Sequence, residues 1–198
     1  MFCHYFITMK KLLLTTILLI SVSIGRAQTK YEKELRIKPD QVPKNAIEFV
    51  QLLNFGTKIK WYQELSETGS SIEAKTKYKG EHYSIEFSKD GTLEDVEVKI
   101  RWNTIPEIVR KRITNDLELK YDDYKLNKVQ IQYQGNPNAI RSYLIKGTDF
   151  NEITINYEVV ISTKVNKKFT QFELLYSAEG ILLKRAEIVL RNSDNIEY

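Results

Sequence analysis

Cysteine and histidine are scarce in this chain. Its 198 residues include one cysteine and two histidines, and Cys3 and His4 lie in a segment that we expect to be removed. The remainder holds only His82, beside a turn, where a lone histidine is most often a solvated or packed residue. Disulfides, thiol chemistry, histidine-dependent triads and the common zinc sites are therefore excluded. We predict no catalytic residue and no metal ligand.

Long hydrophobic runs are also absent, apart from a short one near the amino terminus. A Lys-Lys pair precedes an apolar run over residues 12–20, and small residues follow it as far as Ala27. A membrane-spanning helix needs about 20 apolar residues, so this run is too short. The pattern is typical of a secretory signal peptide. We predict a signal peptide over residues 1–27, with translation starting at Met1 or Met9, and an exported mature chain without a membrane span, periplasmic or extracellular.

An excess of charge of one sign is lacking as well. The formal net charge is +4, but the predicted signal peptide contains three of the 30 basic residues and none of the 26 acidic ones, which leaves +1 for the mature chain. A nucleic-acid partner would require clustered excess basicity. No glycine-rich phosphate loop follows any strand signal. We therefore expect no nucleic-acid partner, no nucleotide and no other cofactor.

What the chain does contain is a pattern that occurs twice. A helix signal with Val42-Pro43 or Ile105-Pro106 precedes strand signals, and each set runs into a similar turn, Ser88-Lys89-Asp90-Gly91 or Ser177-Ala178-Glu179-Gly180. A repeat of this kind makes one small unit the building block of the fold. We predict a flexible lead-in over residues 28–39, a first unit over 40–102, and a second unit over 103–198 that carries an insertion.

Each unit is expected to contain one helix. The first opens near Asp40 and ends at Gly56, whereas the second opens with a capping box formed by Thr104 and Glu107. An apolar stripe that includes Ile108 and Ile113 is expected to face the sheet. The first helix has the corresponding apolar residues Val42, Ala46, Phe49, Val50 and Leu53.

The strand signals alternate between apolar and polar residues, which indicates one buried and one wet face, as in an antiparallel sheet covered by a helix on one side. The chain is therefore predicted to be α+β, with two repeats of a helix packed on a four- to five-stranded antiparallel sheet. Because the second helix signal follows Ile100 closely, we expect either two subdomains with a shared interface or one continuous sheet. In the second unit the strands are expected around residues 128–133, 140–146, 153–163, 169–176 and 182–190.

The stretch from Trp61 to Tyr124 resembles the PepSY-like, beta-lactamase-inhibitor-like family of exported bacterial proteins. The resemblance lies in Trp61, in Tyr83-Ser84-Ile85-Glu86-Phe87 running into Asp90-Gly91, and in Ile105-Pro106-Glu107 opening a helix. Residues 172–180 look like a second occurrence. The resemblance implies an α+β fold and a protein that binds and inhibits other proteins, and it implies no catalytic residue.

The polar face of the first sheet is the predicted recognition surface. Tyr62 lies on this face, and we predict that it binds a protein partner together with Lys75, Glu86 and Lys99. Tyrosine is enriched in recognition surfaces because it offers much contact area at little entropic cost, although strands favour tyrosine in any case. A second tyrosine, Tyr143, is expected on a polar strand face too.

We interpret the chain as an exported, non-enzymatic binding protein, inhibitor-like in its action. The alternative is a small-molecule or envelope-stress binding protein that uses a cleft between the units. A hydrolase relying on carboxylates is least favoured, since adjacent pairs such as Glu94-Asp95 point to opposite faces of a strand. The sequence leaves the partner and the oligomeric state open.

Overall fold

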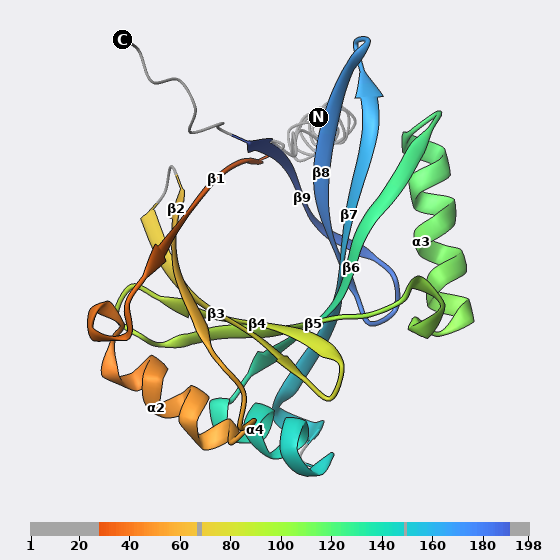
Figure 1. Cartoon of the computed structure of the whole chain (residues 1–198). Helices are drawn as coiled ribbons and strands as arrows, with labels where there is room; N and C mark the ends of the chain where they lie inside the picture. Colours follow the sequence, from red (N-terminus) through yellow and green to blue (C-terminus); the bar gives the residue numbers. More distant parts are fainter. Residues whose placement is uncertain (1–27, 67–68, 149, 191–198) are drawn as a thin grey trace, which may run out of the picture.

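The computed structural model describes residues 28–66, 69–148 and 150–190 (Figure 1). The predicted signal peptide and Cys3 lie outside these residues. In chain order the elements are β1 (Gln28–Ile37), η1 (Pro39–Gln41), α2 (Lys44–Leu53), β2 (Lys60–Ser66), β3 (Gly69–Tyr78), β4 (Glu81–Ser88), β5 (Leu93–Lys99), η2 (Trp102–Thr104), α3 (Glu107–Lys120), β6 (Tyr124–Gly135), α4 (Pro137–Lys146), η3 (Phe150–Glu152), β7 (Ile153–Val165), β8 (Lys168–Ser177) and β9 (Leu182–Leu190). Within the described residues, no helix has the length and apolar character needed to cross a membrane.

One sheet of nine strands organises the molecule. Each strand pairs with the next one in the chain in antiparallel orientation, and β1 and β9 pair in parallel from Gln28–Ala186 to Glu32–Leu190. This last pair joins the two ends of the sheet, so the strands form a closed ring (Figure 1). The α+β class is therefore confirmed, and of the two arrangements expected for the units the structure has the single continuous sheet.

Strand β1 corrects the prediction for residues 28–39. The segment was expected to be a flexible lead-in because it is rich in lysine and glutamate, yet residues 28–37 form a strand that pairs with both β2 and β9. The physical reason lies in the ring, because a strand whose side chains partly face a polar interior needs few apolar residues. The charged composition of β1 therefore did not indicate a strand.

The helices lie outside the ring, and the apolar cores lie between the helices and the outer face of the sheet (Figure 1). Helices α2 and α4 cover one core, in which Ala46, Ile85, Phe87 and Ile140 are fully buried. Helix α3 covers the other, and its contact residues are Val109, Ile113 and Leu117. The inner face of the ring is consequently left to polar side chains.

The two similar turns of the sequence have the same hydrogen-bond pattern. In the first, Gly91 N donates to Ser88 O and Ser88 N donates to Thr92 O; in the second, Gly180 N donates to Ser177 O and Ser177 N donates to Ile181 O. Both glycines have positive φ, +87° and +80°, and both lie against the first turns of a helix, α2 and α3 respectively. Each turn thus supports one helix on the sheet.

Several helix predictions are wrong in detail. Helix α3 begins after Pro106, with no side-chain cap, and Thr104 belongs to η2, so the capping box does not form. Most of the expected apolar stripe is correct, since Val109, Ile113 and Leu117 are buried, but the side chain of Ile108 is 65% exposed and lies outside it. Helix α2 ends at Asn54 in the left-handed conformation, before Gly56.

The strand expected at residues 140–146 is a helix. Asn136 caps α4 by accepting hydrogen bonds from the backbone of Asn138 and Ala139, and Pro137 occupies its first turn. This start signal outweighs the β-branched and aromatic content of the segment. Tyr143 therefore lies on α4 and packs beside Tyr133, with ring centroids 5.2 Å apart, and it does not lie on a polar strand face.

Candidate binding site on the inner face of the sheet

The polar side chains of eight strands meet inside the ring. They line a cavity of about 210 Å³ that extends from β1 to β8. Its charged residues are the carboxylates Glu34, Glu64, Glu73, Glu86, Glu97, Glu158 and Glu173 and the lysines Lys75, Lys99 and Lys128. The carboxylates outnumber the lysines, so the cavity is acidic although the mature chain as a whole was expected to be nearly neutral.

Burial of charge distinguishes this face from an ordinary wet sheet surface. Glu73, Glu97 and Glu158 are only 3%, 4% and 5% exposed. A buried carboxylate is costly unless it is paired or hydrogen-bonded. The polar face predicted from strand alternation is therefore correct in register, but it is the enclosed side of the sheet and not an outward surface.

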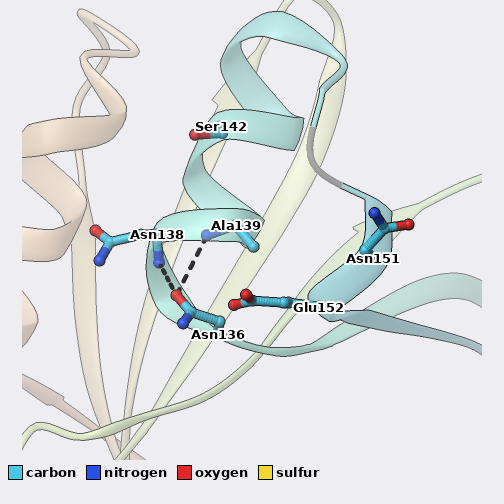
Figure 2. A pocket seen from close by; sticks show the side chains of 6 residues that line it. All are labelled: Asn136, Asn138, Ala139, Ser142, Asn151 and Glu152. Carbon is cyan, nitrogen blue, oxygen red and sulfur yellow. Dashed lines mark hydrogen bonds between the residues drawn. The ribbon is translucent and has the colours of Figure 1, made fainter.

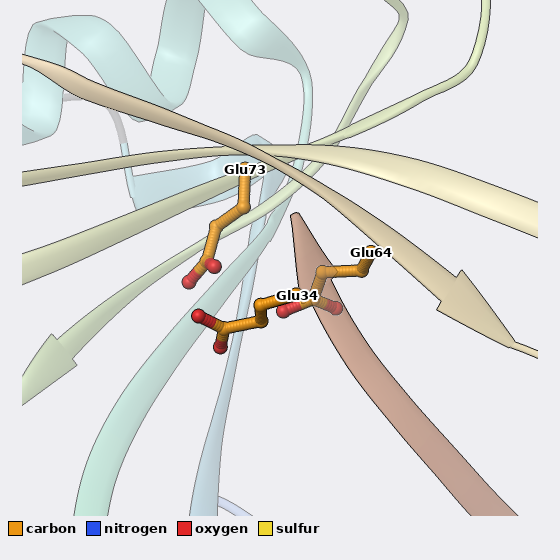
Figure 3. A group of neighbouring side chains, drawn as sticks. All are labelled: Glu34, Glu64 and Glu73. Atoms are coloured by element: carbon orange, nitrogen blue, oxygen red, sulfur yellow. The ribbon is translucent and has the colours of Figure 1, made fainter. Parts of the chain in front are cut away.

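Lys75 links the carboxylates at one end of the cavity, where Glu34, Glu64 and Glu73 come together from β1, β2 and β3 (Figure 3). Its Nζ lies 2.7 Å from Glu34 Oε1 and 2.9 Å from Glu73 Oε2. Burial lowers the pKa of this ammonium, but its hydrogen bond to Glu34 and the charge of Glu73 outweigh that effect and raise the pKa above its usual value. Lys75 is consequently charged at all ordinary pH.

Tyr62 does not line the cavity but lies beside Lys75 at this end of it. It lies directly opposite Glu73 on the neighbouring strand, and Lys75 Nζ is 5.1 Å from the centroid of its ring, a cation–π distance. Two of the four predicted partner-binding residues are thus in contact. Glu86 is opposite Glu73 on the other side, and Lys99 is exposed on β5. All but Tyr62 line the cavity.

A second group of carboxylates lies deeper, on β4, β5 and β7. Asp95 Oδ2 accepts a hydrogen bond of 2.9 Å from Gln132 Nε2, and Gln132 Oε1 in turn accepts one of 3.1 Å from Asn156 Nδ2. Glu158 pairs with Lys128 at 3.0 Å. Gln132 thus orients Asp95, and Lys128 orients Glu158.

Glu97 is the most perturbed acid of this group. Its burial raises the pKa of its carboxyl well above the usual value, and the negative charges of Glu158, Glu86 and Asp95 raise it further. A carboxyl group in these surroundings retains a proton where an exposed glutamate has lost it. Glu97 and Glu158 are therefore suited to sharing one proton.

Sequence reasoning missed Asp95, Gln130, Glu158 and Glu173. Their positions alternate with apolar residues along β5, β6, β7 and β8, so the register placed them on the polar face. What the alternation cannot show is that this face is closed on itself, since that depends on the pairing of β1 with β9. The alternation of the strands therefore indicated which residues share the polar face, but it did not indicate that this face is buried.

A second hollow lies beside α4, away from the inner face (Figure 2). Its lining is polar and comes from Asn136, Asn138, Ala139, Ser142, Asn151 and Glu152, around a volume of about 350 Å³. The oxygen of Asn136 is already used to cap the helix. The hollow contains no convergent set of groups for chemistry, and it is not a cleft shared by the two predicted units.

Three solved structures are similar to the chain. A DUF2874 family protein from Bacteroides ovatus matches with a TM-score of 0.48 and 13% identity, covering 74% of this chain and 88% of that one. A BLIP-like protein from Bacteroides fragilis matches with a TM-score of 0.45 and 18% identity, covering 79% and 93%. A candidate periplasmic protein from Bacteroides eggerthii matches with a TM-score of 0.47 and 11% identity, covering 74% and 88%.

The predicted likeness to beta-lactamase-inhibitor-like proteins is thereby confirmed as a structural similarity. No family model and no curated protein matches the chain.

Proposed function

We propose that this chain is an exported, non-enzymatic binding protein that recognises a protein partner at the inner face of its sheet. The observation that carries the proposal is the acidic cavity, because burying so many charges inside a ring stabilises the fold little and calls for another use. Tyr62, Lys75, Glu86 and Lys99 are the contact residues. Tyr62 and Lys99 lie nearer to solvent, and the carboxylates lie behind them.

The size of the cavity favours a protein over a small organic ligand. Pockets for such ligands usually enclose about 300–1,000 Å³ and are mainly apolar, whereas this one encloses about 210 Å³ and its lining is dominated by charged groups. A side chain or loop tip of a partner protein fits such a space. The alternative, a small-molecule or envelope-stress binding protein, would require a small and polar ligand in the same cavity.

Site-specific photo-crosslinking in the cell envelope tests this proposal. A photoreactive residue at position 99, on the inner face, should form a covalent adduct with one partner. The same residue at position 111, which is exposed on the outside of α3, is the matched control and should form none. Adducts that form only at position 111 would place recognition on the helices, and equal adducts at both positions would show contact without a defined site.

A further inference from the structure

The inner face contains two groups of three carboxylates, and one of them already binds a cation of the chain itself. In the group of Glu34, Glu64 and Glu73, the ammonium group of Lys75 contacts two of the three carboxylates (Figure 3). The oxygens that a metal ion would need are therefore taken up by Lys75. Because Lys75 occupies this group, we expect no metal ion there, and a change in this group serves as a control for calcium binding at the other one.

The other group consists of Glu86 on β4 and of Asp95 and Glu97 on β5. One carboxylate oxygen of each lies within 4.8 Å of the others. Three carboxylate oxygens this close together are within reach of a single cation. Calcium tolerates flexible arrangements of oxygen ligands, whereas magnesium requires near-ideal octahedral geometry and loses its water reluctantly, so calcium is the better fit.

Gln130 provides an independent indication of a ligand. It is 4% exposed, lines the same cavity as Glu86 and Glu97, and lies opposite Lys99 on β5 and Glu158 on β7. Among the described residues, none donates a hydrogen bond to its Oε1. A buried amide oxygen without a donor costs free energy. A bound cation, or a water molecule that it carries, would satisfy this oxygen.

The surroundings set the expected strength of binding. Asp95 is held in place by Gln132, so one ligand is oriented before an ion arrives. Lys128 lies nearby, bonded to Glu158, and its positive charge opposes a second cation. Binding should therefore be weak, with a Kd of about 10⁻⁴–10⁻³ M, the range of calcium sites in extracellular modules.

We propose that Glu86, Asp95 and Glu97, with the amide oxygen of Gln130, form a binding site for Ca²⁺ on the inner face of the sheet. The calcium site shares Glu86 with the proposed partner-binding residues, but calcium binding by the protein alone can be tested without a partner. The sequence predicted no metal ligand because its carboxylates are scattered, and the pairing of β4 with β5 and of β5 with β6 brings them together.

Calorimetric titration of the exported protein tests the site, after treatment with EDTA and removal of the chelator. CaCl₂ should bind once per chain and raise the melting temperature, and MgCl₂ should bind more weakly. Glu97→Gln and the half-buried Glu86→Gln should each weaken calcium binding by about tenfold or more, since affinity follows the number of charged ligands. Circular dichroism confirms that each variant is folded.

The matched control is Glu64→Gln, which removes one negative charge from the same face at the Lys75 end. It should leave calcium affinity nearly unchanged. Equal losses in all three variants would reduce the effect to the general charge of the cavity and would overturn the site. The absence of heat and of a melting shift in the unmodified protein, at about ten times the expected Kd, would overturn it as well.

Discussion

Glu97 and Glu158 are hydrogen-bonded to each other although they come from β5 and β7, with the whole of β6 between their strands. The two carboxyl groups meet because the sheet curves inward and closes. Like charges at hydrogen-bond distance cannot both be ionised at low cost, so one proton is shared. We therefore expect this pair to make the stability of the fold depend on pH.

The first prediction concerns that pH dependence in calcium-free protein. The pKa of Glu97 is raised in the folded state by burial and by the charges of Glu158, Glu86 and Asp95. The folded state therefore holds a proton that the unfolded chain loses near pH 4.3. Its stabilising contribution is fully present below that pH and is lost as the pH rises through the folded-state pKa.

Replacing Glu97 by Gln should remove this loss, because the amide donates a hydrogen bond to Glu158 at every pH. Denaturant unfolding in EDTA should find the variant more stable than the unmodified protein at pH 8, with a smaller difference at pH 5. Glu94→Gln, on the exposed side of the same strand, is the control and should behave like the unmodified protein. A variant that is less stable at pH 8 would contradict the shared proton.

A second prediction uses Ile108 and Ile113 on α3. Ile113 is fully buried against the sheet, and its replacement by Ala should cost about 2–5 kcal/mol. Ile108 is 65% exposed, so Ile108→Ala should change stability by no more than about 0.5 kcal/mol. Urea unfolding of the two variants measures both. Equal costs would mean that Ile108 is buried as well, as the sequence predicted.

The face shared by neighbouring strands could be predicted from the sequence, whereas the exposure of Ile108 could not. Strand alternation placed Tyr62, Lys75 and Glu86 on one face, which the pairing of β2, β3 and β4 confirms. Local patterns suffice for this because neighbouring strands in the chain are neighbours in the sheet. The exposure of Ile108 was missed because it lies next to the buried Val109 at the edge of the apolar face, and the sequence pattern does not fix where that face ends.

The closure of the ring could not be predicted from the sequence, for a different reason. It depends on β1 pairing with β9, two segments from opposite ends of the described chain, and β1 has the charged composition of a loop. No local signal reports such a contact. Glu73, Glu97 and Glu158 are buried because the ring is closed, so their burial could not be predicted either.

A third prediction tests how the turns hold the helices. A methyl group added at Gly91 would approach Pro43 Cβ to 2.7 Å, whereas one added at Gly80, which has a similar positive φ, would meet nothing within 4 Å. Gly80→Ala should therefore cost only the strain of the left-handed backbone, about 1–2 kcal/mol. Gly91→Ala should cost more, because α2 must shift. Thermal unfolding compares the two variants. Equal losses of stability would show that α2 can move away from Gly91 at little cost.

A fourth prediction concerns the ion pair of Glu73 and Lys75. Glu73 is 3% exposed, so Lys75→Met leaves a buried carboxylate without its cation and should cost about 1–3 kcal/mol. The additional change Glu73→Gln removes that charge and should restore most of the loss. Urea unfolding of the single and double variants decides the matter. A double variant less stable than Lys75→Met alone would show that the pair is not the source of the effect.

The last prediction separates recognition from stability with two tyrosines. Tyr62 lies on the inner face beside Lys75, and Tyr143 lies on α4 and packs against Tyr133 in the outer core. Tyr62→Ala should weaken binding of the crosslinked partner by more than about 1 kcal/mol, as truncation of an interface aromatic does, while the melting temperature stays nearly constant. Tyr143→Ala should do the reverse and lower the melting temperature without weakening binding.

The contrast is informative because both changes remove the same side chain from the same protein. A loss of binding that merely followed instability would appear in Tyr143→Ala as well, and a contact role appears in Tyr62→Ala alone. If Tyr62→Ala binds normally, recognition lies away from the Lys75 end of the inner face. If it lowers the melting temperature as much as Tyr143→Ala, then Tyr62 serves the fold through its contact with Lys75, and the partner surface has to be sought at Lys99.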